Sequence, residues 1–177
     1  PKMRHDTVLK AFKAVMDKSN CELVLIFRRF GSFSTAFEDE MRKLAEELGI
    51  SESVVWLDKM DYKEIPVLYS LADVVVNVPE QDGLPVTLLE VSACKTPVVT
   101  SDLPPYQEFL SDGAYVRVRT WDVEGIVTAI QFVLKKSHEQ LVEDLEINYD
   151  LILQRAEQTK CFSVMENIYQ EAQRTVL

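Results

Sequence analysis

Cysteine and histidine are scarce in this sequence, and neither is spaced as a site would require. Cys21, Cys94 and Cys161 are widely separated within 177 residues, so we expect neither a disulfide framework nor a zinc site. They are predicted to be core cysteines of a protein in a reducing compartment. His5 and His138 have no second histidine or cysteine at metal-ligand spacing, and we predict no metal.

Basic residues and long apolar runs are also lacking. The chain has 19 Lys and Arg against 29 Asp and Glu, a formal net charge of −10. Because nucleic-acid affinity comes mainly from clustered basic side chains, we expect no nucleic-acid partner. The apolar run 71–78 is interrupted by Asp73 and is far shorter than the roughly 20 residues of a membrane span. No secretory signal is visible, so we expect a cytoplasmic location, although Pro1 in place of Met is compatible with a piece of a longer chain.

The remaining composition, 47% hydrophobic and 27% charged, is that of a globular protein, and we expect a single domain over 1–177. Helical and strand periodicities alternate along it. Gly49 is expected to end the second helix as a C-cap. Helices are predicted at 7–16, 37–48, 65–71, 85–94, 123–136, 139–154 and 162–176, and strands at 21–27, 53–57, 73–78, 97–100 and 114–118.

This alternation predicts an α/β fold with a doubly wound parallel sheet and a helical C-terminal tail. Its strands are expected to be buried on both faces. Ligands of such a sheet bind beyond the carboxyl ends of the strands, where loops lead into helix N-termini. Those loops are expected at 28–34, 58–62, 79–84, 101–106 and 119–122.

The third loop combines an acid, a glycine and a helix start. Gly83 is expected where the backbone approaches a ligand closely, and Pro85 stands at the start of the next helix. The backbone N–H groups of Gly83, Leu84 and Val86, together with the positive end of the helix dipole, are predicted to hold a diphosphate.

Glu90 is the only charged residue of that helix. A carboxylate in such apolar surroundings is unfavourable unless it is paired, hydrogen-bonded or facing a cleft. One interpretation gives Asp82 and Glu90 two separate ligand contacts. In the other, Asp82 caps the helix and Glu90 pairs with a basic neighbour. The spacing of the two acids leaves both open.

The stretch PEQDGLPVTLLEVSACKTPVVTSDLPPYQEFL resembles the donor-site signature of family-four (group 1) glycosyltransferases of the GT-B fold. Upstream, DYKEIPVLYSLADVVVNVP and PKMRHDTVLKAF are similar to the segments that lead into it, and downstream CFSVMENIY is similar to the closing helix. The resemblance implies the C-terminal, nucleotide-sugar-binding domain, Rossmann-like, with the N-terminal acceptor domain absent. It also implies that Asp82 contacts the transferred sugar and Glu90 the ribose hydroxyls.

Several residues depart from the family pattern. Asp82 stands where the family usually has Glu, and Lys95 stands where a turn usually has Gly. Pro104 and Pro105 replace the glycine pair that commonly precedes a glutamate, which is Glu108 in this sequence. These changes imply a reshaped loop on the phosphate side.

The basic pair that neutralises the diphosphate in this family is also altered. Its Arg would precede Pro1, and Met3 occupies the usual Lys position. Lys2, Arg4, Arg28 and Arg29 are candidate substitutes.

The resemblance implies a retaining hexosyltransferase that uses a nucleoside diphosphate sugar as donor, with no metal or cofactor. It would be inactive or weakly active as this domain alone, and peripheral membrane association would come only through the missing half. One alternative is a degenerate donor domain that acts as an interaction module without nucleotide. The other is a nucleotide-sugar epimerase or phosphorylase of similar fold. Tyr106 and Trp121 lie on ligand-side loops, where they either stack on the base or sugar or cover the core.

Overall fold

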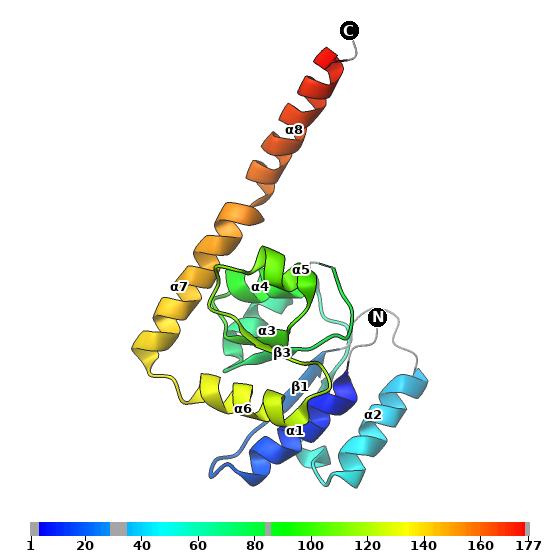
Figure 1. Cartoon of the computed structure of the whole chain (residues 1–177). Coiled ribbons are helices and arrows are strands. Elements are labelled where there is room, and N and C mark those ends of the chain that lie inside the picture. Colours follow the sequence, from blue (N-terminus) through cyan, green and yellow to red (C-terminus); the bar gives the residue numbers. More distant parts are fainter. Residues whose placement is uncertain (1–3, 29–34, 84–85, 176–177) are drawn as a thin grey trace.

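A computed structural model describes residues 4–28, 35–83 and 86–175 and has helices alternating with parallel strands (Figure 1). The strands are β1 (Leu25–Arg28), β2 (Val54–Leu57), β3 (Val75–Asn77), β4 (Val98–Ser101) and β5 (Val116–Val118). The helices are α1 (His5–Asp17), α2 (Thr35–Glu47), α3 (Ile65–Leu71), α4 (Val86–Ala93), α5 (Pro104–Phe109), α6 (Val123–Leu134), α7 (His138–Arg155) and α8 (Gln158–Thr175). Two short 3₁₀ turns, η1 (Ser51–Ser53) and η2 (Tyr62–Glu64), complete the order.

All strand pairs are parallel, but the described strands form two sheets. β1 pairs with β2, with Leu25 opposite Val54, and a second sheet has the order β3-β4-β5. Within the described residues, β1 and β3 therefore each pair along one edge alone. The Rossmann-like arrangement is confirmed, with its strands divided between two sheets.

Helices cover both faces of the strands, as a doubly wound fold requires (Figure 1). α1 and α6 pack on one face of the three-stranded sheet, and α1 and α2 pack beside β2. α3, α4, α5 and α7 share a core on the other face. Neighbouring residues of β4 divide between these cores, Val99 on the α1/α6 side and Val98 on the α4 side.

Some predicted features are wrong in detail. The strand expected at 21–27 begins only at Leu25, and Ile26 is 45% exposed rather than buried on both faces. Its sheet has two strands, so less of its surface is covered. Cys21 and Cys161 are exposed and Cys94 is half-buried, so the prediction of core cysteines fails. Helix α5 was not predicted at all.

Two helices end in left-handed residues. Gly49 has φ of 69°, which confirms it as the C-cap of α2. After α4 the same role falls to Lys95, with φ of 51°. The Thr96 N–H donates to the Val91 carbonyl at 3.1 Å, as in a glycine-ended helix. A lysine thus adopts a conformation that glycine takes without strain.

The helical tail is confirmed. Ser137 and Gln140 form a capping box at the start of α7, and α8 extends away from the rest of the molecule (Figure 1). The described side chains of α8, 158–173, are all exposed. Within the described residues, no helix is both long and apolar enough to span a bilayer.

Candidate functional site

Three buried groups tie together the carboxyl ends of β3, β4 and β5. The Pro79 carbonyl accepts hydrogen bonds from the Ser101 hydroxyl at 2.7 Å and the Thr120 hydroxyl at 2.8 Å. The two hydroxyls are 3.0 Å apart. Because all three groups are buried, the loop that follows Pro79 starts from a fixed point.

That loop carries Asp82 and Gly83 into α4. The Gly83 N–H donates to Asp82 Oδ1 at 2.8 Å, and its predicted binding of a diphosphate stays a prediction. A Cβ added at Gly83 would meet no atom of the described residues within 4 Å, its chain neighbours aside, so these residues leave space beside its backbone. Val86, the first residue of α4, is 61% exposed. Leu84 lies outside the described residues.

The carboxylate of Asp82 is also held by a tyrosine. The Tyr106 hydroxyl donates to Asp82 Oδ2 at 3.2 Å. Tyr106 lies on α5 and is fully buried, so it covers the core rather than stacking on a ligand. Burial, followed by the charge of Asp82, raises the pKa of this tyrosine. Its hydroxyl therefore stays a donor.

Glu90 has a matching tyrosine partner. The Tyr69 hydroxyl, from α3, donates to Glu90 Oε2 at 3.3 Å. Burial first, and then the charge of Glu90, raises the pKa of Tyr69 to about 12. The charge of Glu90 also raises the pKa of the exposed Tyr62. Glu90 forms no salt bridge within the described part of the chain, so the structure does not support the interpretation that pairs it with a basic neighbour.

The candidate cations differ in their surroundings. Arg4 donates to Glu80 Oε1 at 2.7 Å and to both carboxylate oxygens of Asp6 at 3.1 Å. Two acids already neutralise this guanidinium. Arg28 ends β1, half-buried, and its charge lowers the pKa of Tyr69, though less than burial and Glu90 raise it. Lys2 and Arg29 lie outside the described residues.

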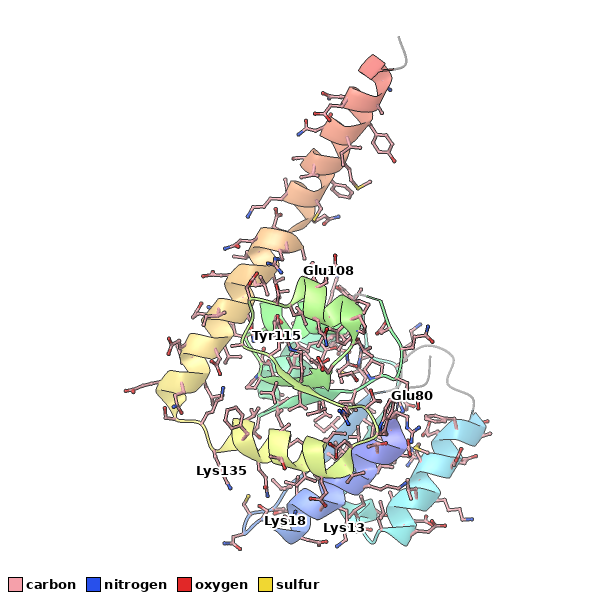
Figure 2. All side chains as sticks on the ribbon, viewed as in Figure 1. Lys13, Lys18, Glu80, Glu108, Tyr115 and Lys135 are labelled. Atoms are coloured by element: carbon pink, nitrogen blue, oxygen red, sulfur yellow. The ribbon has the colours of Figure 1, made fainter. Side chains whose placement is uncertain are left out.

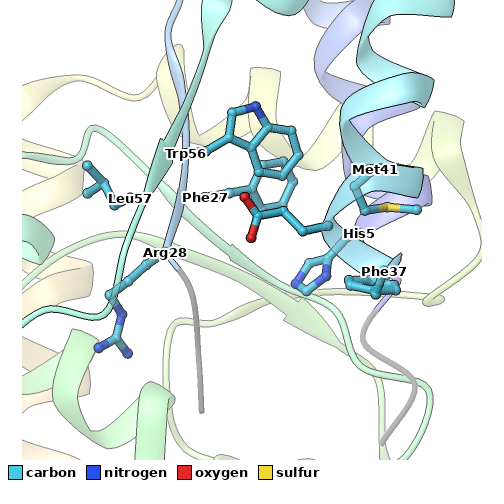
Figure 3. Close-up of a pocket in the computed structure, with 8 residues that line it drawn as sticks. His5, Phe27, Arg28, Phe37, Met41, Trp56 and Leu57 are labelled. Carbon is cyan, nitrogen blue, oxygen red and sulfur yellow. The ribbon is translucent and has the colours of Figure 1, made fainter. Parts of the chain in front are cut away.

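An aromatic pocket adjoins this region at the carboxyl ends of β1 and β2. Figure 3 shows Phe27 and Trp56 face to face on neighbouring strands, with His5, Phe37 and Met41 facing them from the helices. The Phe27 and Trp56 rings stack with centroids 5.0 Å apart. Burial lowers the pKa of His5, so the imidazole stays neutral near neutral pH.

The described residues around these groups offer no metal site, and the lysines labelled in Figure 2 lie elsewhere. No cluster of three or more His, Cys, Asp or Glu suited to a metal occurs among the described residues. Lys13, Lys18 and Lys135 lie along the α1 and α6 layer, away from Glu80 (Figure 2). The site is therefore described chiefly by carboxylates, tyrosine hydroxyls and the N-terminus of α4.

The sequence predicted the two carboxylates of the site, Asp82 and Glu90, but not the side chains that form hydrogen bonds with them. Tyr69 and Glu90 are 21 positions apart, and Asp82 and Tyr106 are 24 apart. Glu80 and Arg4 are 76 apart. Such contacts form because the parallel strands bring distant loops to the same edge of the sheet. The spacing of apolar residues along the chain does not predict which loops these are.

The chain is similar to known glycosyltransferases in sequence. The family described as "Glycosyl transferases group 1" matches residues 1–148. The chain is 29% identical over 80 residues to the O-antigen chain mannosyltransferase RfbU of Salmonella typhimurium. It is 31% identical over 101 residues to a GDP-mannose-dependent alpha-(1-6)-phosphatidylinositol monomannoside mannosyltransferase of Mycolicibacterium smegmatis.

These matches cover 45% and 52% of the chain but only 23% and 26% of the two relatives, about a quarter of their length. Among solved structures, S. aureus TarM in complex with fondaparinux, alpha-GlcNAc-glycerol and UDP superposes with a TM-score of 0.79 at 16% identity. That superposition covers 96% of this chain and 33% of TarM. The fold is thus one half of a GT-B arrangement.

Proposed function

The chain belongs to the group 1 glycosyl transferases, and we propose that it is the donor-binding half of a retaining glycosyltransferase. In this proposal, residues 1–177 bind a nucleoside diphosphate sugar for hexosyl transfer. An acceptor domain outside this sequence supplies the acceptor contacts and any membrane association. This domain alone binds the donor and transfers little.

The placement of the two carboxylates at α4 carries the proposal. Asp82 precedes the helix N-terminus and Glu90 lies on the helix, each accepting a hydrogen bond from a tyrosine hydroxyl. A carboxylate has lone pairs left after one such bond and accepts the two hydroxyls of a ribose well. Glu90 takes that role, and Asp82 contacts the transferred sugar.

The diphosphate lies at the start of α4. Backbone N–H groups there, including that of Val86, and the positive end of the helix dipole attract anions without basic side chains. The open space beside Gly83 gives the phosphates room to approach the backbone. No metal takes part in this proposal.

The comparisons support a nucleotide donor. One matched relative is named for its dependence on GDP-mannose, and the TarM structure contains UDP. Two of the three matched curated relatives are named as mannosyltransferases, and the third is named as UDP-forming, so GDP-mannose and a UDP-sugar are the first donors to test. The unpaired state of all three cysteines supports a cytoplasmic, reducing location.

The ion pairs of Arg4 favour a second candidate function, that of an interaction module without transfer activity. Because Glu80 and Asp6 already neutralise its guanidinium, the leaving diphosphate would lose a cation that aids departure. A donor domain that has lost transfer and serves as an interaction module fits this observation. That reading predicts no nucleotide binding.

Thermal-shift and calorimetric titrations with UDP, GDP, ADP, UDP-glucose and GDP-mannose test the proposal. At least one nucleotide is expected to stabilise the parent in proportion to the fraction bound, and Glu90→Gln to weaken it. Glu52→Gln, in η1 before the amino end of β2, is the matched control. The proposal fails if no nucleotide shifts the midpoint or if E90Q binds like the parent.

A further inference from the structure

The side chain of Asp82 is exposed and lies in a loop, yet both of its oxygens are occupied. Oδ1 accepts the Gly83 N–H at 2.8 Å, and Oδ2 accepts the Tyr106 hydroxyl at 3.2 Å. Tyr106 is the only side chain within the described residues that donates to this carboxylate. Apart from the backbone N–H of the adjacent Gly83, the direction in which Asp82 points therefore depends on this tyrosine hydroxyl.

Tyr106 is well suited to fix another group. Its side chain has 0% exposure and packs in the core with Leu88, Val98 and Leu110. It follows two prolines that begin α5, and its backbone N–H donates to the Leu103 carbonyl at 2.9 Å. A ring enclosed in this way has one rotamer, and its hydroxyl has one position.

We propose that Tyr106 is a positioning residue for the donor sugar, which orients Asp82 through the hydrogen bond between them. The inference rests on the proposed function, because it takes Asp82 as the sugar contact. Each carboxylate oxygen retains a lone pair for a sugar hydroxyl. Without the tyrosine hydroxyl, the exposed aspartate samples several rotamers and must be ordered when the sugar binds, which lowers affinity.

The raised pKa of Tyr106 is consistent with this role, since its hydroxyl remains protonated and able to donate to Asp82 above pH 10, where an exposed tyrosine ionises. The contact is also local. Asp82 would touch the sugar and not the nucleoside, so the effect of Tyr106 should be confined to donors that carry a sugar.

Tyr106→Phe removes the hydroxyl and keeps the ring. Calorimetry is expected to show that Y106F binds the nucleoside diphosphate sugar about three- to tenfold more weakly than the parent. Affinity for the corresponding nucleoside diphosphate should be unchanged. Tyr115→Phe is the matched control, because Tyr115 is also buried and its hydroxyl is bonded to Ser92 at 2.8 Å instead of to the loop.

Asp82→Ala gives a second test that does not depend on the folding of Y106F. It removes the acceptor, so it should show a sugar-selective loss, and adding Y106F to D82A should cost no further affinity. Equal weakening of sugar donor and diphosphate by Y106F, an unchanged ratio between them, or additive losses in the double variant would overturn the inference. If the parent protein binds no nucleotide, both the proposed function and this inference are wrong.

Discussion

The guanidinium of Arg4 lies 2.7 Å from the carboxylate of Glu80, and this ion pair joins the start of α1 to the loop after β3. Both side chains are partly buried, at 31% and 24% exposure. Asp6 shares the same guanidinium. Arg4 is thus engaged by acids before any anion binds, and an incoming diphosphate would compete with them.

Glu80→Gln is expected to tighten binding of nucleoside diphosphates about two- to fivefold, because it removes a repelling charge and releases Arg4. Calorimetry at low and at high salt measures the effect, which should shrink as salt rises. In an Arg4→Gln background the gain from E80Q should be smaller. Weaker binding by E80Q would mean that the ion pair shapes the loop instead of competing with the ligand.

Gly83→Ala is expected to weaken ligand binding without lowering the stability of the fold. The added methyl meets no described atom within 4 Å, so the free energy of unfolding should stay equal or rise by about 0.5 kcal/mol. Binding of the nucleotide sugar should weaken about tenfold, because the methyl occupies space that the phosphates need. Denaturation and titration of the same samples measure both quantities.

Gly49→Ala is the reciprocal control. Its φ of 69° makes alanine unfavourable, so it should destabilise the fold by about 1 kcal/mol and leave affinity unchanged. Unaltered affinity in G83A would show that the ligand does not approach this backbone.

Alkaline pH is expected to weaken the fold through Tyr69. Its pKa is raised from 10.0 to about 12, so between these values tyrosine ionises in the unfolded chain and stays neutral in the native one. The stability from this shift is complete below pH 10 and is lost as pH rises to about 12, by about 2 to 3 kcal/mol. Urea unfolding of the parent and of Tyr69→Phe should show a smaller loss in Y69F. Equal losses would contradict the assignment.

Lys95 allows a test of backbone strain at the end of α4. Its φ is 51°, while its ammonium contacts Glu146 at 2.6 Å and lies 4.6 Å from the centroid of the Tyr149 ring. Lys95→Gly and Lys95→Ala lose these contacts equally, but only glycine relieves the strain. K95G should therefore be more stable than K95A by about 1 kcal/mol in chemical denaturation. The reverse order would mean that the left-handed conformation carries no strain.

Much of the fold follows from periodicity. Alternating helical and strand patterns predicted the α/β class, and Gly49 was correctly placed as a C-cap because a left-handed residue must end α2. Helix α5 was not predicted because its six residues, which begin with two prolines, are too few to show a helical period. Cys21 was predicted in the core because it begins the run 21–27 taken as a buried strand, yet the strand begins four residues later.

The candidate site was predictable in part. Glu90 stood out as a lone charge in an apolar helix, and resemblance to a family supplied roles for it and Asp82. Neither source indicated that Tyr69 and Tyr106 hold these acids, because Tyr69 lies within a predicted helix and Tyr106 in a loop where its role was left open. The engagement of Arg4 by Glu80 was likewise hidden, since it links chain positions that only the assembled fold brings together.

The edges of β2 and β5 that no described strand pairs with have a consequence for colloidal behaviour. Backbone donors and acceptors along such edges are templates for strands of another copy, and β2, with the sequence VVWL, is wholly apolar. The net charge of −10 keeps copies apart by mutual repulsion. Since added salt screens that repulsion within about 10 Å at 0.1 M, precipitation of this protein should be promoted by ionic strength and resisted in dilute buffer.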